Sequence, residues 1–383
     1  MAYVADPTNA AEPADSADAS GGAAEFRALK AYLQTLLNSG SGIPVTGYAW
    51  QGFRNKLING NFDVWQRGTS LAAGTGRRFI ADRWGADAVG STIAPSRQAF
   101  TLGQTTVPFE PQFFHRAVVV TSAGASNYAA VTQRIEGVRT FAGQSAILGF
   151  WAKADAVKNI AVEFKQHFGT GGAPSADVNA IAVTTKTLGT DFQYFTVPVT
   201  PPSITGKTLG TAGNDFLEVI FWLEAGSTFN ARTNSLGQQS GTFDIAQVQL
   251  EPGSSATPFE LLPPDKIMES CQRFYEKSYN LETAPGTATY TGSERKIART
   301  AFLLGDMACS FRVSKQKNPT ITTYSPQTGA SGNSAELDAS GVFVADRTNG
   351  SGDIGQNRFR IQQNGNATAD RQYALHWTAD AEL

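Results

Sequence analysis

A period-two alternation of apolar and polar residues runs through the middle of this chain and constrains its fold more than any other feature. Ile160, Val162 and Phe164 fall on one face of such a segment, with Ala161 and Glu163 on the other. Because successive residues of a strand point to opposite faces, this period indicates β-strands. The other segments of this kind are 117–121, 131–135, 146–151, 193–199, 216–224 and 242–250. No helical pattern interrupts them, so we expect an antiparallel β-sandwich rather than parallel βαβ units.

One of these segments breaks its own alternation. In 242–250 the apolar phase switches between Ile245 and Val248. A β-bulge, or a strand buried on both faces, would produce such a switch.

The N-terminal part, 1–54, differs from the rest. Residues 1–22 are rich in Ala, Asp, Pro and Ser, a composition that should not fold alone. A stripe at helical spacing follows, made of Phe26, Leu29, Leu33 and Leu36. A single helix of this length is marginal in water, so its apolar stripe needs a partner, either the body of the chain or other subunits. We expect a tail-like arm, a helix and a linker.

Beyond the first β region, 55–263, the pattern predicts two further parts. Residues 265–277 read as a short helix with Ile267, Cys271 and Phe274 along one side, so we assign 264–277 to a connecting helix. Strand signals return in 278–383, separated by loops rich in Gly, Ser and Asn. This part is predicted to be a smaller C-terminal β-sandwich, with strands in 301–313, 320–324, 341–345, 358–362 and 372–377.

Composition and charge exclude several classes of partner. The formal net charge is -2 and only 17% of the 383 residues are charged. No basic stripe exists to neutralise phosphates, so we expect neither nucleic acid nor an anionic membrane surface as the partner. No apolar run approaches the ~18 residues of a membrane span, so no membrane insertion is expected. The N-terminus lacks the pattern of a signal peptide. Cys271 and Cys309 are expected to be buried free thiols, with a disulfide as the alternative.

We find no catalytic constellation, so the chain is expected not to be an enzyme. HExxH, CxxC and GxSxG patterns are missing from the sequence. Glu218 and Glu224 flank Trp222 on one strand face, but six strand residues span roughly 20 Å, too far for a glycosidase acid pair. An outward tryptophan beside carboxylates can instead stack on a sugar ring, so these three residues are the candidate glycan site. A subunit interface, or burial under a loop, are the alternative roles of Trp222.

A set of short motifs resembles bacteriophage tail-fibre and tail-appendage proteins. The segment 55–68, NKLINGNFDVWQRG, resembles the motif that opens their jelly-roll domain. Further matching segments follow in the same order: 81–84 (ADRW), 131–136 (VTQRIE), 246–253 (AQVQLEPG), 256–260 (ATPFE), 271–275 (CQRFY) and 379–383 (ADAEL). The resemblance covers 55–277 well and 278–383 more loosely.

The opening and closing motifs are also similar to those of jelly-roll carbohydrate-binding modules. This similarity implies a β-sandwich with a glycan-binding surface. Some members hold a structural calcium near the first and last strands, and Asp63, Asp244 and Glu251 are the matching candidates here. Calcium takes six to eight oxygen ligands, more than these side chains supply alone.

The resemblance extends to the role of the whole chain. The arm and helix of 1–54 are similar to the attachment end of short-tailed phage appendages, which are usually homotrimers. The resemblance therefore implies a virion tail protein, assembled in the cytoplasm of a bacterial host, that binds other tail proteins through 1–54. Its β domains would adhere to host-surface polysaccharide or another receptor. A purely structural tail adaptor or decoration protein is the alternative, and a glycan depolymerase a further one.

Overall fold

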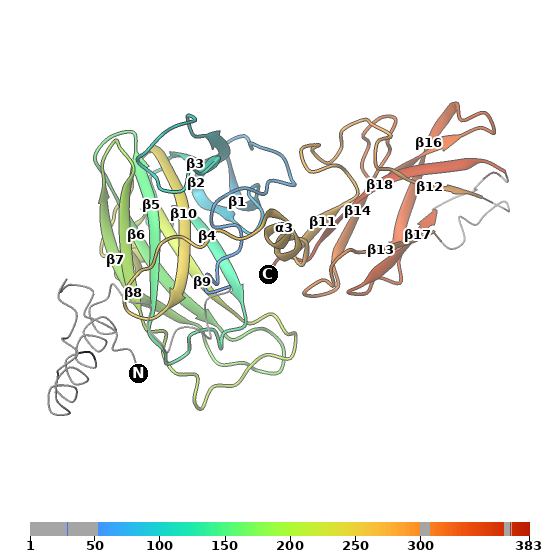
Figure 1. Cartoon of the computed structure of the whole chain (residues 1–383). Helices are drawn as coiled ribbons and strands as arrows, with labels where there is room; N and C mark the ends of the chain where they lie inside the picture. The colour runs from blue at the N-terminus through green and yellow to red at the C-terminus, as the bar shows by residue number, and fades with distance from the viewer. Residues whose placement is uncertain (1–28, 30–52, 299–306, 364–367, 369) are drawn as a thin grey trace, which may run out of the picture. The chain divides into compact units, whose positions relative to one another are not determined.

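The computed structural model describes residues 29, 53–298, 307–363, 368 and 370–383 (Figure 1). The chain divides into two units, Met1–Arg54 and Asn55–Leu383. The expected helix with Phe26, Leu33 and Leu36 lies outside the described residues, apart from Leu29 itself. The structure described below is that of 53–298, 307–363, 368 and 370–383.

Ten antiparallel strands form the first β structure, which occupies Gly74–Pro252. Their bounds are β1 Gly74–Phe79, β2 Gly85–Ala99, β3 Phe113–Val120, β4 Tyr128–Glu136, β5 Ala146–Ala154, β6 Lys158–His167, β7 Val178–Leu188, β8 Gln193–Val199, β9 Phe216–Ala225 and β10 Gly241–Pro252. Every segment expected to be a strand in this region is one. Strands β1, β2 and β7 were not expected.

The long strand β2 turns this single hydrogen-bonded sheet into two layers. Its first part, at 85–89, pairs with β4, whereas its second part, at 92–99, pairs with β3. One layer therefore has the order β7-β6-β9-β4-β2-β1, and the other has the order β2-β3-β10-β5-β8. Between the two parts of β2 lies Gly90, at a positive φ of 70°.

Apolar side chains from both layers meet in one core. Phe221 of β9 and Phe150 of β5 face each other edge-on, with ring centroids 5.0 Å apart. Leu217, Val219 and Leu223 join this core, as the alternation along β9 predicts. The described chain is thus mainly β, with a jelly-roll-like β-sandwich, which confirms the fold class (Figure 1).

The phase switch predicted in β10 is a β-bulge. Ala246 pairs with Trp151 and Gln249 with Gly149, so two residues of β10, Gln247 and Val248, stand opposite one residue of β5. Gln247 takes a positive φ of 44° at this point. Residues 243–251 are all buried, so β10 is also a strand buried on both faces, which was the other explanation of the phase switch.

The second β structure begins after helix α3 (Pro264–Gln272). Its eight strands are β11 Tyr275–Lys277, β12 Glu294–Ile297, β13 Met307–Ser310, β14 Thr320–Tyr324, β15 Asn333–Leu337, β16 Phe343–Gly352, β17 Arg358–Gln363 and β18 Gln372–Asp380. Strand β18 is central, because β11, β12, β14 and β15 all pair with it. A separate core gathers around Phe359 and Trp377. The predicted division of 55–383 into two domains and a connector stays a prediction.

The connecting helix is shorter than expected. It ends at Gln272, and Tyr275–Lys277 form strand β11 instead. The backbone of these three residues pairs with β18, and this pairing supplies the hydrogen bonds that a longer helix would have made internally.

Side chains around this helix also link the two β structures. The guanidinium of Arg83 lies 3.4 Å from the centre of the Phe274 ring and pairs with Glu382.

Cys271 and Cys309 are both free and buried, as expected. Among the described residues, no helix is long and apolar enough to cross a membrane.

Candidate functional site

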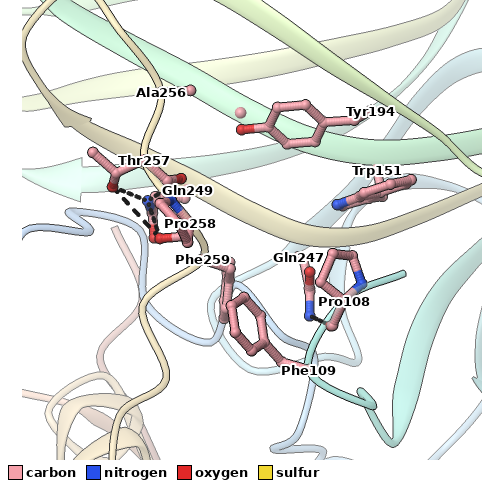
Figure 2. A pocket seen from close by; sticks show the side chains of 11 residues that line it. Pro108, Phe109, Trp151, Tyr194, Gln247, Gln249, Ala256, Thr257, Pro258 and Phe259 are labelled. Atoms are coloured by element: carbon pink, nitrogen blue, oxygen red, sulfur yellow. Dashed lines mark hydrogen bonds between the residues drawn. The ribbon is translucent and has the colours of Figure 1, made fainter. Parts of the chain in front are cut away.

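A pocket of about 400 Å³ opens on the outer face of the β3-β10-β5-β8 layer, and eleven described residues line it (Figure 2). Strands β5, β8 and β10 form its floor, and two loops form its walls. The lining residues are Pro108, Phe109, Gly149, Trp151, Tyr194, Gln247, Gln249, Ala256, Thr257, Pro258 and Phe259. Pockets that bind small ligands in proteins have volumes of this order.

Two aromatic side chains lie side by side on the strand floor of the pocket (Figure 2). Trp151 and Tyr194 are direct partners across β5 and β8, and their ring centroids are 5.5 Å apart. Tyr194 is 44% exposed. Burial of the rest of its side chain raises the pKa of the Tyr194 hydroxyl, and the charge of Glu251 adds to this effect, so the hydroxyl stays protonated and can donate a hydrogen bond.

Gly149 makes room for this arrangement. A Cβ at this position would lie 2.2 Å from the Tyr194 hydroxyl oxygen. The missing side chain therefore allows the tyrosine to lie down over β5, with its polar end above the strand.

Amide side chains from the bulge of β10 stand on the floor of the pocket. Gln247 and Gln249 are two residues apart on β10 and both line the pocket, whereas Val248 between them packs in the core. Gln247 donates a hydrogen bond through Nε2 to the backbone oxygen of Pro108 (2.6 Å), and its buried Oε1 has no partner among the described residues. Gln249 accepts the backbone N–H of Glu260 (2.7 Å). These bonds hold both amides in place.

Two loops complete the pocket on the side opposite the aromatic pair (Figure 2). Pro108 and Phe109 come from the loop between β2 and β3, and Phe259 comes from the segment that follows β10. Phe109 has a positive φ of 65° and is 51% exposed. An exposed aromatic in a strained backbone conformation is costly, which is a common sign of a ligand contact.

The chemistry of the lining is aromatic and amide, without charge. None of the eleven residues is Asp, Glu, Lys, Arg or His. The pocket therefore offers flat apolar faces and neutral hydrogen-bonding groups, without a carboxylate, imidazole, ammonium or guanidinium among its described lining residues.

The structure places the residues of the expected glycan site differently. Trp222 is only 3% exposed, and its Nε1 donates a hydrogen bond to Oε2 of Glu163 (2.9 Å). Phe229, in the short η2 segment Ser227–Phe229, packs against it. Trp222 thus has the role that we named as the alternative, burial under a loop. An open sugar-stacking surface at this tryptophan is not present.

The two carboxylates beside Trp222 are buried as well. Glu218 accepts hydrogen bonds from Arg77 (2.8 Å) and Arg134 (3.1 Å). Burial acts to raise the pKa of Glu218, but these two guanidiniums outweigh it and hold the pKa below its ordinary value. Glu224 is fully buried and accepts a hydrogen bond from the hydroxyl of Thr121 (3.0 Å). Both acids have structural partners.

The three candidate calcium ligands are each engaged elsewhere. Asp244 pairs with Arg116 through two bonds of 2.8 Å, and Glu251 accepts hydrogen bonds from Thr257 (2.7 and 2.6 Å). Asp63 is bonded to Asn61, and burial raises the pKa of its carboxyl. Across the residues that the structure describes, no group of three or more His, Cys, Asp and Glu is placed to hold a metal ion. The geometry gives the calcium prediction no support.

Sequence reasoning did not find the pocket, although part of its signal was readable. Trp151 and Tyr194 both lie in segments predicted to be strands, and each occupies the outward phase of its alternation. The pairing of β5 with β8 brings them together, and a single sequence does not reveal this pairing. The two loops that wall the pocket carry no periodic signal.

Comparisons with known proteins give similar folds. No protein-family model matches the chain, and no curated protein matches it. Similar solved structures include a putative sugar binding protein from Bacteroides thetaiotaomicron, with 14% identity, a TM-score of 0.33, and coverage of 52% of this chain and 100% of that one.

A carbohydrate-binding module of family 11 from Clostridium thermocellum has 11% identity and a TM-score of 0.29, over 48% of this chain and 99% of that one. The enzymatically active domain of tailspike protein 4 of bacteriophage CBA120 has 14% identity and a TM-score of 0.28, over 52% of this chain and 22% of that one. At TM-scores below 0.5 these likenesses carry no argument about this chain.

Proposed function

We propose that this protein is a glycan-binding adhesin that holds an uncharged part of a polysaccharide in the pocket around Trp151 and Tyr194. The single observation that carries the proposal is the pair of aromatic rings on adjacent strands, half-buried Trp151 and exposed Tyr194, 5.5 Å apart and beside fixed amide groups. Pyranose rings have apolar C–H faces and hydroxyl edges. Aromatic rings of Trp and Tyr combine an apolar face with a polar tip and so match both.

The lining also favours binding over catalysis. A glycosidase needs two carboxyl groups flanking the scissile bond. The pocket has no carboxyl group among its described lining residues. We therefore propose a non-enzymatic role, in which sugar hydroxyls exchange hydrogen bonds with Gln247, Gln249 and the Tyr194 hydroxyl.

The wider role that we propose is that of a bacteriophage tail fibre or tail appendage. The motif in 55–68 and its ordered companions support this, as does the amphipathic pattern in 1–54. In this proposal 1–54 attaches the chain to other tail proteins of the virion, and the stripe of Phe26, Leu29, Leu33 and Leu36 assembles a homotrimer. Three copies would raise a weak sugar affinity by avidity.

The pocket is tested with variants of the full chain. Trp151→Ala and Tyr194→Ala are titrated against a panel of neutral oligosaccharides (glucans, mannans and galactans) together with the wild-type protein. Loss of an aromatic anchor should weaken binding by roughly tenfold or more. The matched control is Tyr290→Ala, since Tyr290 lies near β12 and lines no part of this pocket. Equal affinities for the wild type and both pocket variants would refute the site.

The wider role has its own tests. Immunogold labelling of virions should place the protein at a distal position of the tail, and a position at the tail hub would favour the purely structural adaptor. Light scattering should give three times the chain mass, and a monomer would contradict the trimer. Release of reducing sugar ends from host polysaccharide would establish the depolymerase instead.

A further inference from the structure

A second pocket, of about 190 Å³, lies on the outer face of the other layer, over β4, β6 and β9. Its described lining residues do not overlap with those of the first pocket. Four cationic side chains line it: Arg77, Arg134, Lys165 and Arg232. The carboxylates in its lining are Asp87 and Glu218, so the lining carries four positive and two negative charges, a difference of +2.

The positive charge is crowded at one end of this pocket. Nη1 of Arg77 and Nε of Arg134 both reach the same oxygen of Glu218, Oε1, at 2.8 and 3.1 Å. Nη1 of Arg77 also lies 3.6 Å from Oδ2 of Asp87, and Nη1 of Arg134 donates a hydrogen bond to the backbone oxygen of Leu383 (2.7 Å). Burial lowers the pKa of Arg134, and the charge of Arg77 lowers it further, so the two cations repel each other here. A bound anion would relieve this repulsion.

The other two cations are paired with acids behind the lining. Lys165 contacts Asp177 (2.7 Å), and Arg232 contacts Glu163 through two bonds of 2.8 and 2.9 Å. Neither acid lines the pocket. These pairs hold the two cationic groups at the rim and leave their remaining N–H donors for a ligand.

Two buried polar atoms at the pocket have no partner among the described residues. These are the hydroxyl Oγ1 of Thr132, a residue that is 3% exposed, and Nε of Arg77. Both atoms lie beside Gly85: a Cβ at this residue would be 3.1 Å from Oγ1 of Thr132 and 3.2 Å from Nε of Arg77. A buried donor or hydroxyl left unpaired destabilises the folded chain, so a ligand that hydrogen-bonds both atoms regains this free energy.

The far end of the pocket is aromatic. Tyr128, Trp222 and Phe229 line it. Trp222 is only 3% exposed and the Arg232 guanidinium lies 5.0 Å from its ring centre, so the half-buried Tyr128 and Phe229 supply the accessible aromatic faces. The Tyr128 hydroxyl lies 3.3 Å from Asp87. The pocket thus joins an apolar wall to a cationic end within a small volume. A ring with a carboxylate at one side has this shape and this distribution of charge.

We propose that this second pocket binds a small carboxylate-bearing compound of about the size of one sugar ring, of the hexuronic acid class, with its carboxylate at Arg77 and Arg134. Guanidiniums bind planar carboxylates through parallel N–H donors, and Lys165 adds charge. The hydroxyl of Thr132 bonds the carboxylate or a ring hydroxyl. This site is independent of the neutral glycan pocket.

The test uses the full chain and three probes: D-glucuronate, D-glucose and inorganic phosphate. Ligand-observed NMR titration at low salt should give a dissociation constant for glucuronate on the order of 1 mM, since the ligand is small. Glucose and phosphate should each bind at least roughly tenfold more weakly, because each lacks one half of the recognised chemistry. Added salt should weaken the binding of glucuronate.

Two variants report on the site without removing its central ion pairs. Thr132→Val keeps the shape and removes the unpartnered hydroxyl, so the fold should tolerate it and glucuronate affinity should fall about fivefold. Lys165→Met removes one charge and should weaken binding about threefold. Lys186→Met on β7 is the control, because Lys186 does not line this pocket. Urea denaturation of each variant checks the fold.

The outcomes separate clearly. Glucuronate affinity that is equal in the wild type, Thr132→Val and Lys165→Met would overturn the proposal. Phosphate that binds as tightly as glucuronate would overturn the assignment to a carboxylate sugar. Neutral oligosaccharides that saturate the first pocket should leave glucuronate affinity unchanged. The experiments can therefore refute the carboxylate site without refuting the neutral glycan pocket, and the reverse.

Discussion

His115 should make the stability of this protein fall in mild acid. The ring is fully buried on β3, between Phe62 and Trp65, with ring centroids at 5.6 and 6.0 Å. Neither ring nitrogen has a partner among the described residues. Burial alone lowers the pKa of His115 from 6.5 to about 4, because the charged form would lose its hydration inside the core.

The sign and size of the effect follow from this difference in pKa. Between pH 6.5 and about pH 4, His115 of the unfolded chain binds a proton that His115 of the folded chain does not. The contribution of His115 to the unfolding free energy is therefore complete above pH 6.5 and is lost as the pH falls towards 4. Each pH unit contributes about 1.4 kcal/mol, so the gap of about 2.5 units amounts to roughly 3 kcal/mol. That is a large part of the stability of an ordinary domain.

The assay is urea denaturation of the wild type and His115→Phe from about pH 7 down to pH 4, the range set by these pKa values. Phenylalanine suits the aromatic surroundings, although its extra volume can cost about 1–3 kcal/mol at every pH. The difference in unfolding free energy between the two proteins removes the contributions of other titrating groups, such as Asp63 and Asp82, whose pKa values burial raises. This difference should change by roughly 3 kcal/mol across the range. A difference that stays constant with pH would refute the reasoning.

Three further predictions concern other residues. Trp222→Ala should lower the unfolding free energy by about 3–5 kcal/mol in urea denaturation, and a loss below about 1 kcal/mol would contradict its burial. Gly149→Ala should weaken neutral-glycan binding in titration, because its Cβ displaces the Tyr194 hydroxyl; unchanged affinity would mean that this hydroxyl is not used. Cys309, whose pKa burial raises to about 12, and the buried Cys271 should react with a thiol reagent only after denaturation, so fast labelling of the native protein would contradict their burial.

Part of the candidate site could be predicted from the sequence. The alternation placed Trp151 and Tyr194 on strands, and the phase switch near Val248 marked the bulge that carries Gln247. Trp222 is not the open stacking surface that the sequence predicted, because it is buried, although Trp222 and Glu218 both line the second pocket. An outward phase on a strand says that a side chain leaves the first core, but not whether another segment then covers it, as Phe229 does here.

The sequence by itself determined that this chain is mainly β, with two β regions and a helix before the second. These properties depend on the period of apolar residues and on turn residues, both of which act over a few neighbouring positions. It also determined the low charge. It left a disulfide between Cys271 and Cys309 open, and the structure shows both thiols free and buried.

Only the tertiary structure decided which outward faces stay open. Strand pairing joins Trp151 to Tyr194 across β5 and β8, and Arg77 to Arg134 through Glu218, over separations of 43 (194 minus 151) and 57 (134 minus 77) residues. Such contacts depend on the register of the strand pairs and on how the sheet folds into two layers. Many residues spread along the chain together determine both, so no short segment of sequence reveals them. Tryptophan therefore lines an open pocket on one layer, as Trp151, and is part of a covered cluster on the other, as Trp222.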